Sequence, residues 1–330
     1  MSGTKVSRRG FMAASTGLGV AFACPSIVRA ASYATQPIRL FVGTGAAGTN
    51  DLVARLIAPV LKEELGQPVL VENRPGAATT LALGLVSKAR PDGHTLLVSS
   101  GAAVAVHVTS VTKPADLIKD LGHVGMICDG AYTYAVNAQL AAKDAKEFIE
   151  LLKKEPGKIR YGGTGPGGTI HLSGELFCLR TGTKMTVVQY TNAGMRASDL
   201  LANETQLGIG GIGVLGQHIK SGALRGLFVA GEQREPLFPD LPTSVELGIK
   251  DLESITNWFG LHGPKGMPDQ IVRQLNAALA KAIAHTEVRN VLGANGMFVS
   301  GGPPEALVAR MNKDHKVLSE VAEAANIRVE

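Results

Sequence analysis

The feature that most constrains the fold is a glycine-rich turn that joins an apolar run to an amphipathic run near residue 50. Ile38–Val42 reads as a short buried strand, and after the turn Gly43–Asn50 the apolar residues keep helical spacing from Asp51 until Gly66. A second short apolar run, Val69–Val71, follows at once. A strand, a helix and a strand in this order predict two parallel strands with a crossover helix between them.

The same alternation continues along the chain and predicts an α/β fold with parallel or mixed sheets. At 330 residues the chain is long enough for about two domains. The spacing of apolar residues predicts further helices at Thr80–Lys88, Ala145–Glu155, Thr169–Arg180, from Pro268 onward and at Pro304–Ala325, and further strands at Thr95–Ser99, Lys158–Tyr161, Met185–Tyr190 and Leu224–Ala230.

Composition excludes several classes of protein. With 45% hydrophobic and 18% charged residues, the chain is not intrinsically disordered. It has 33 Lys and Arg against 28 Asp and Glu, but four of the basic residues lie among the first 30 residues, which contain no acid. Because the remainder is nearly neutral, we expect no binding to nucleic acid.

The first 30 residues are arranged like an export signal. Ser7–Met12 contains a pair of arginines, an uncharged and mostly apolar run extends to Val28, and the small-residue exit Val28-Arg29-Ala30 follows. This layout predicts a twin-arginine signal over residues 1–30, a mature chain from Ala31 and a periplasmic location. A membrane anchor is the alternative, but glycines and a proline interrupt the run before it reaches the ~20 apolar residues that a spanning helix needs.

The remaining cysteines give no sign of a metal site. Cys128 and Cys178 lie far apart in sequence and have no Cys or His nearby at metal-ligand spacing. We expect both to be buried as small hydrophobic residues, and we expect no metal and no cofactor.

Three glycine-rich turns at predicted strand-to-helix junctions are the best candidates for chemistry: Gly43–Asn50, Gly162–Gly168 and Gly208–Gly213. The unpaired N–H groups and positive dipole end of a helix start can bind an anion without any basic side chain. The simpler alternative is that these glycines only permit tight turns.

A second alternative is an exported oxidoreductase that uses NAD(P). Gly43-x-Gly45-x-x-Gly48 satisfies the dinucleotide fingerprint, and Glu72 follows where a ribose-binding acid belongs. No motif of a hydrolase, a zinc protease or a phosphate-binding loop accompanies it. His171 could donate to a ligand, and Trp258 could stack on one, but both residue types are as often structural.

Segments along nearly the whole mature chain resemble one family. They are Pro37–Leu40, Asp51–Leu56, Gly66–Ala77, Pro91–Leu97, Pro156–Lys158, His171–Phe177, Leu241–Gly248 and Trp258–Leu261. Together they resemble the periplasmic solute-binding receptors of tripartite tricarboxylate transporters, often called Bug receptors. The resemblance implies a receptor and not an enzyme.

The family resemblance implies a two-lobed, type II-like periplasmic binding protein, with a parallel or mixed sheet in each lobe and two hinge crossings. One lobe would comprise residues 31–128 and 231–330, and the other residues 129–230. Such a protein closes on a small organic carboxylate and presents it to the permease subunits of the transporter. We expect it to act as a monomer.

In that family the first loop and the glycine loop of the second lobe hold carboxylates through backbone N–H groups, small hydroxyls and ordered water. We therefore expect Gly45–Asn50 and Gly163–Thr169 to face each other across a cleft. Replacing Gly165 by a bulky residue should weaken binding with little effect on stability. The candidate ligand-binding residues are Thr44, Gly45, Ala46, Ala47, Gly48, Thr49, Asn50, Ser99, Ser100, Gly163, Thr164, Gly165, Gly168, Thr169, His171, Tyr190 and Gly210.

Departures from the family pattern bear on the ligand. Thr44 stands where members usually carry an aromatic residue, and Gly210 where many carry Asp, so we expect a roomier pocket. A buried ammonium needs an acidic partner, and the cleft segments offer only Asp51 and Asp199. We therefore expect a dicarboxylate or an aromatic acid, with Trp258 or Tyr190 as a flat apolar surface, and not an amino acid.

Overall fold

A computed structural model describes residues 33–46, 48–76, 79–112, 115–190 and 193–330. The predicted signal segment 1–30 and the candidate site residue Ala47 lie outside these residues. Within the described part, no helix is both long and apolar enough to cross a membrane.

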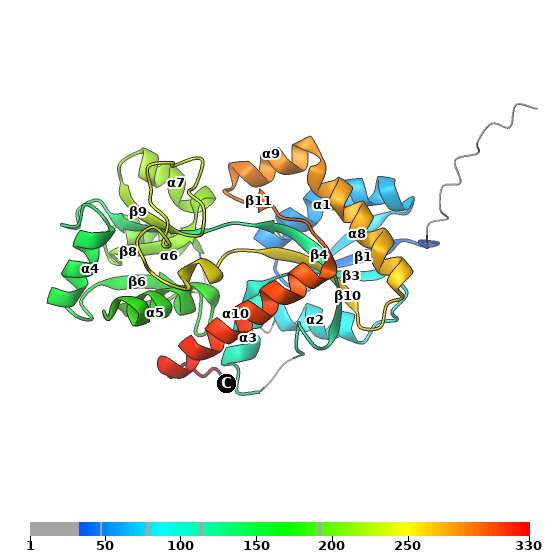
Figure 1. Cartoon of the computed structure of the whole chain (residues 1–330), viewed down its shortest axis with the longest axis horizontal. Coiled ribbons are helices and arrows are strands. Elements are labelled where there is room, and N and C mark those ends of the chain that lie inside the picture. Colours follow the sequence, from blue (N-terminus) through cyan, green and yellow to red (C-terminus); the bar gives the residue numbers. More distant parts are fainter. Residues whose placement is uncertain (1–32, 47, 77–78, 113–114, 191–192) are drawn as a thin grey trace, which may run out of the picture. The chain divides into compact units, whose positions relative to one another are not determined.

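The first sheet contains six strands in the order β11-β4-β10-β3-β1-β2. β1 pairs in parallel with β2 and β3, and β10 is antiparallel to β3 and β4 (Figure 1). Its strands are β1 (Ile38–Val42), β2 (Val69–Asn73), β3 (Thr95–Ser100), β4 (Leu121–Asp129), β10 (Phe259–Pro264) and β11 (Phe298–Val299), and its helices are α1 (Thr49–Leu65), α2 (Thr80–Ser87), α3 (Gly101–Thr109), α8 (Asp269–Ala284) and α9 (Thr286–Ala294).

The second sheet contains five strands in the order β7-β6-β8-β5-β9. β6 is parallel to β7 and β8, whereas β5 is antiparallel to β8 and β9. Its strands are β5 (Tyr132–Asn137), β6 (Arg160–Gly163), β7 (Thr186–Gln189), β8 (Leu207–Gly211) and β9 (Leu224–Ala230), and its helices are α4 (Ala145–Lys154), α5 (Thr169–Thr181), α6 (Ala193–Leu201) and α7 (Ile212–Lys220). The expected α/β fold with mixed sheets is therefore confirmed.

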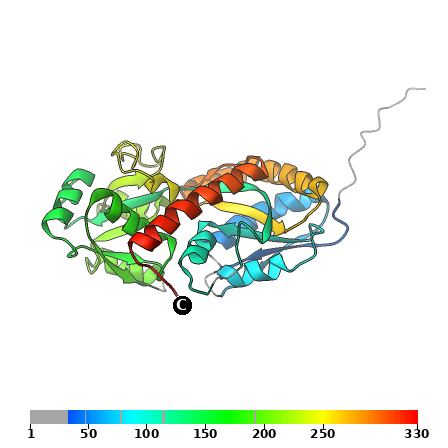
Figure 2. The same ribbon diagram turned by 60° about the horizontal axis from the view of Figure 1, so that its bottom comes forward.

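Two connections carry the chain between the sheets. β4 leads directly into β5, and β9 leads through residues 231–258 and the short 3-10 helix η2 (Leu252–Ser254) into β10. The last helix, α10 (Pro304–Ala324), packs on α3 and β4 of the first sheet and on α5 of the second, as both ribbon views show (Figures 1 and 2). The lobe limits at 128/129 and 230/231 stay a prediction, and the segment after β9 still pairs with it through Val229 and Thr243.

The core explains several sequence expectations. Cys128 and Cys178 are free and buried, as predicted. Trp258 is fully buried, and its indole N–H donates to Asp314 at 2.5 Å. It is therefore unavailable to stack on a ligand, which corrects the expectation that it could offer an apolar surface to one.

Candidate functional site

The first glycine-rich turn connects β1 to α1. Gly48 is the N-cap residue of α1, and no side chain caps the first turn of this helix. The Gly48 N–H donates to the Gly45 carbonyl at 3.2 Å, which closes the turn. A Cβ on Gly48 would lie 2.9 Å from the Thr44 hydroxyl oxygen. Asp51 is not free for a ligand, because Arg55 and Asn73 both donate to its carboxylate.

The second glycine-rich turn, between β6 and α5, is built in the same way. Gly168 is an N-cap residue without a side-chain cap, and its N–H donates to the Gly165 carbonyl, again at 3.2 Å. The Thr164 hydroxyl covers Gly168 as Thr44 covers Gly48. Residues 43–49 and 163–169 share the sequence Gly-Thr-Gly-x-x-Gly-Thr, so one local design occurs once beside each sheet.

Residues from both turns line one cavity of about 350 Å³. Thr49 comes from the first turn, Thr164 and Thr169 come from the second, and Gly210 and Gly211 come from the end of β8. The other lining residues are Leu52, Tyr132, Ile170, Arg196, Gly213, Val214, Asn257, Asn295 and Met297. No Asp or Glu is among them. The cavity thus combines hydroxyls, amides, helix starts and a single charged side chain.

The remaining candidate residues lie outside this lining. Thr44, Gly45, Ala46, Gly48 and Asn50 form the body of the first turn or the start of α1, and Gly163, Gly165 and Gly168 form the second turn. Ser99 and Ser100 are buried at the end of β3. Their roles in binding stay predictions.

His171 and Tyr190 both have protein partners. The Gly167 N–H donates to His171 Nδ1 at 3.1 Å, so the imidazole braces the second turn, and burial lowers its pKa. The Tyr190 hydroxyl donates to Asp199 at 2.6 Å, and burial together with this bond raises the pKa of Tyr190 to about 12. Asp199 is therefore also occupied.

Sequence reasoning missed Arg196, which lies on α6. Its aliphatic stem lies over Gly162 of β6, where a Cβ would come within 2.6 Å of the Arg196 Cγ. Its Nη1 donates to the Ile209 carbonyl at 2.9 Å, and burial lowers its pKa. No motif marks it in the sequence, because the packing of α6 on β5 and β8 brings it to the cavity.

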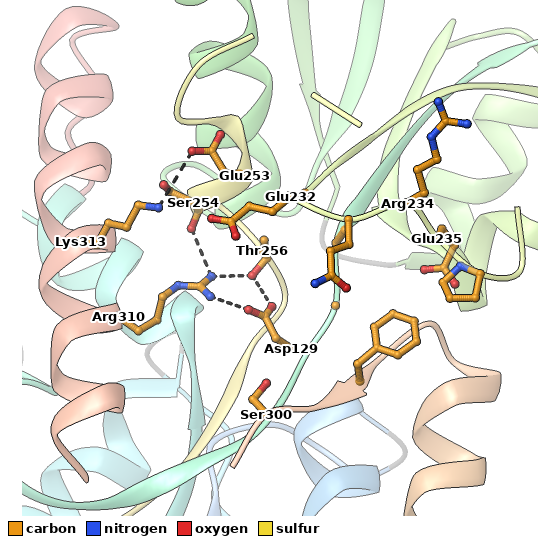
Figure 3. Close-up of a pocket in the computed structure, with 16 residues that line it drawn as sticks. Asp129, Glu232, Arg234, Glu235, Glu253, Ser254, Thr256, Ser300, Arg310 and Lys313 are labelled. Carbon is orange, nitrogen blue, oxygen red and sulfur yellow. Dashed lines mark hydrogen bonds and ion pairs between the residues drawn. The ribbon is translucent and has the colours of Figure 1, made fainter. Parts of the chain in front are cut away.

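A larger cavity of about 440 Å³ lies beside the two crossings between the sheets (Figure 3). Its cations are already paired with acids. Arg310 binds Asp129 and Asp314, and Lys313 lies 4.0 Å from Glu253. Arg234, which also lines the cavity, pairs at 3.0 Å with Glu246, which does not. Because these lining cations are paired with acids, the described part of this cavity offers no unpaired positive charge to an anion. The smaller cavity is therefore the candidate binding site.

The structure argues against a dinucleotide site, because the acid expected to bind the ribose is already paired with arginines. Glu72 accepts from Arg39 at 2.6 Å and from Arg74 at 2.8 Å, so its carboxylate is engaged in two ion pairs. Within the described residues, no group of His, Cys, Asp and Glu side chains could hold a metal ion.

Known proteins resemble this chain in sequence and in fold. Protein BugT of Bordetella pertussis is 32% identical over 271 residues, which cover 82% of this chain and 83% of that protein. The R. palustris protein Rpa4515 with adipate has a TM-score of 0.77 and 28% identity over 89% of this chain and 98% of its own. MatC of Rhodopseudomonas palustris with bound malate has a TM-score of 0.74 and 26% identity over 87% of this chain and 99% of its own.

The family model described as tripartite tricarboxylate transporter family receptor matches residues 53–317. This family consists of periplasmic substrate-binding receptors and not of enzymes, so the oxidoreductase alternative is wrong. The two-lobed fold is that of the periplasmic binding proteins. The chain belongs to the tripartite tricarboxylate transporter receptor family.

Proposed function

We propose that this chain is an exported solute receptor that binds a small organic carboxylate, either a dicarboxylate or an aromatic acid, in the cavity shared by the two glycine-rich turns. It delivers this ligand to the membrane permease of a tripartite tricarboxylate transporter and acts as a monomer without a cofactor. The observation that carries the proposal is the pair of Gly-Thr-Gly-x-x-Gly-Thr turns beside one cavity whose described lining residues include no Asp or Glu.

The chemistry of the turns favours an anion. Each turn leads into a helix whose first turn lacks a side-chain cap, so backbone N–H groups and the positive dipole end remain for a ligand. Hydroxyls of Thr49, Thr164 and Thr169 add donors. The solved relatives carrying adipate and malate support a carboxylate ligand in this family.

An amino acid is a poorer fit than an acid without an amine. The two nearby carboxylates, Asp51 and Asp199, are both occupied by protein donors, so neither can neutralise a buried ammonium. Arg196 would repel such a group as well. We therefore favour succinate over aspartate, for example, as the kind of ligand bound.

Calorimetry on the purified mature chain with a panel of carboxylates tests this function. We expect one or more of them to bind, and Thr164→Val to weaken that binding about tenfold, as for one lost hydrogen bond to a charged group. Thr286→Val, at an exposed position on α9, is the matched control and should bind as the wild type does. Failure of every carboxylate to bind, or turnover of one by the pure protein, would refute the function.

The export route rests on the sequence of residues 1–30 alone. Replacing both Arg8 and Arg9 by Lys should leave the precursor inside the cell, because the arginine pair is the element that this pathway reads. Cell fractionation followed by immunoblotting measures the outcome. Normal delivery of the double variant to the periplasm would contradict twin-arginine export.

A further inference from the structure

Among the residues that the structure describes, Arg196 is the only charged one that lines the candidate binding cavity. Its one hydrogen bond within the described part of the chain goes to the Ile209 carbonyl, so one of its five N–H donors is used. It makes no ion pair there. The undescribed residues 1–32, 47, 77–78, 113–114 and 191–192 contain no Asp or Glu, so none of their side chains can supply a carboxylate to Arg196.

Other half-buried arginines show how this chain normally satisfies a guanidinium. Arg180 pairs with Asp251 and Glu320, and Arg310 pairs with Asp129 and Asp314. Arg225 has no carboxylate but donates to the carbonyls of three residues, at 2.8 to 3.3 Å. Arg196, with one carbonyl, is the exception among the four. Because a half-buried charge without a counterion is costly, we expect a counterion from outside the chain.

The cavity has room for such a counterion near Arg196. Gly211 has no atom within 4 Å of the position that a Cβ would take, and for Gly210 the nearest atom is 3.8 Å away. Both glycines follow Ile209 on β8, whose carbonyl receives the Arg196 hydrogen bond. The end of β8 therefore leaves space in the cavity instead of filling it with a side chain.

We propose that Arg196 forms a second anionic subsite, so that the ligand is a dicarboxylate. One carboxylate lies at the glycine-rich turns, and the other pairs with the guanidinium through two parallel N–H bonds, the geometry for which arginine is suited. This inference rests on the proposed function, because it narrows the proposed carboxylate ligand to one with two carboxylates. It assigns Arg196 as the specificity-determining residue and excludes an aromatic monoacid as the preferred ligand.

Calorimetry with matched pairs of acids tests the subsite. The pairs are succinate with butyrate, malate with 3-hydroxybutyrate, adipate with hexanoate, and terephthalate with benzoate, so that each pair differs in its second carboxylate. The wild type should bind at least one dicarboxylate 10-fold or more tightly than its monocarboxylate partner. Arg196→Met, which keeps an apolar stem, should lower that dicarboxylate affinity by about 10- to 100-fold and so reduce the preference for the dicarboxylate over its monocarboxylate partner at least about fivefold.

Arg196→Lys separates charge from geometry and guards against misfolding of the methionine variant. We expect it to recover part of the dicarboxylate affinity, because lysine keeps the charge and loses the planar fork. Equal binding of both members of every pair by the wild type, or an unchanged dicarboxylate affinity in the folded variants, overturns the inference while the proposed function stands. Failure of all eight acids to bind the wild type overturns the proposed function itself.

Discussion

Gly211 is the residue at which the cavity can be filled with least disturbance to the fold. It has an ordinary backbone conformation with φ −64° and open space around its Cβ position. Gly165 differs, because its φ of +101° is a conformation that residues with side chains rarely adopt. The sequence-based expectation that Gly165 could be replaced without loss of stability is therefore wrong, and Gly211 is the better position.

Gly211→Leu should lower carboxylate affinity at least 10-fold, because its side chain would occupy the cavity. The unfolding free energy of the ligand-free protein should change by less than about 1 kcal/mol, the usual scale for an N-cap substitution. Gly165→Leu should lose affinity and also about 1–3 kcal/mol of stability from backbone strain. Calorimetry and urea denaturation measure both quantities, and wild-type affinity in Gly211→Leu would contradict the assignment of the cavity.

At the scale of elements, Arg310 of α10 ties together the two connections between the sheets. It donates to Asp129 at the end of β4 and to Thr256 before β10 (Figure 3). It also donates to Asp314 on its own helix. Burial alone would lower the pKa of Arg310, but Asp129 and Asp314 reverse this and raise it.

Arg310→Met should reduce the unfolding free energy by about 3–5 kcal/mol, because it leaves two acids beside the hinge without their counterion. Arg289→Met, on the exposed surface of α9, is the control and should change it by less than about 0.5 kcal/mol. Urea denaturation followed by circular dichroism gives the values. Adding Asp129→Asn to Arg310→Met should restore part of the loss, and no recovery in this double variant would argue against a charge origin.

A pair of histidines joins β4 to β10. The Nδ1 atoms of His123 and His262 lie 3.0 Å apart, and His123 Nε2 lies 3.1 Å from the Ile118 carbonyl, to which it donates. In the neutral pair, His123 carries its proton on Nε2 and accepts at Nδ1 from the Nδ1–H of His262. Burial lowers both pKa values, although Asp116 partly opposes this for His123.

Groups whose pKa is lowered on folding stabilise the protein above the pKa of the unfolded chain, near 6.5 for histidine, and lose this stabilisation as the pH falls. We expect the unfolding free energy to fall below about pH 6.5, by at most about 1.4 kcal/mol per pH unit for each imidazole. His123→Gln should flatten the profile, and His285→Gln, at an exposed position, should not. Equal wild-type stability at pH 7.5 and 5.5 would contradict the neutral pair.

Sequence periodicity predicts those helices and strands whose apolar pattern is complete within the element's own residues. β1 and β9 match their predicted limits, and the other predicted helices and strands agree within two residues. The sequence predicts no limits for α3, α6, α7, α9, β4, β5, β8, β10 and β11. α3 begins as an uninterrupted run of small apolar residues, which shows no helical period. β4 and β10 contain glycines, which weaken the sequence signal for a strand. These two strands form by pairing with each other although they lie more than 130 residues apart in the sequence.

The sequence predicts the candidate site only in part, because contacts between distant parts of the chain leave no local signal. Both glycine-rich turns carry a local signal, and Thr49, Thr164 and Thr169 reach the cavity from them. Arg196, Asn257 and Asn295 carry none, because their nearness depends on how distant elements pack. The position of an arginine in the sequence does not show whether its guanidinium forms an ion pair with a carboxylate in the folded protein.

At the scale of the whole two-sheet unit, the cavity is lined from both sheets, and their elements also touch beside it. A Cβ on Gly213, at the start of α7, would lie 3.0 Å from the backbone of Asn295, which follows α9. Because both residues line the cavity, we expect the lobes to meet at this contact on closing around a ligand.

We expect a saturating carboxylate to reduce the radius of gyration of the wild type, because a ligand that contacts both lobes favours the closed form by its differential affinity. Gly213→Phe should hold the contact apart, weaken binding about 10-fold or more and keep the larger radius. Gly293→Ala, on α9 with open space around its Cβ, is the control and should close normally. Small-angle scattering measures the change, and identical dimensions with and without ligand in the wild type would contradict closure.

The central claim is that the paired glycine-rich turns and Arg196 form one site for a dicarboxylate. A crystal structure of the wild type with the dicarboxylate that binds it most tightly tests this claim most directly. We predict one carboxylate within hydrogen-bond distance of backbone N–H groups or threonine hydroxyls of the two turns, and the other paired with the Arg196 guanidinium. A ligand bound in the cavity beside Arg310, or a guanidinium of Arg196 without contact to the ligand, would contradict it.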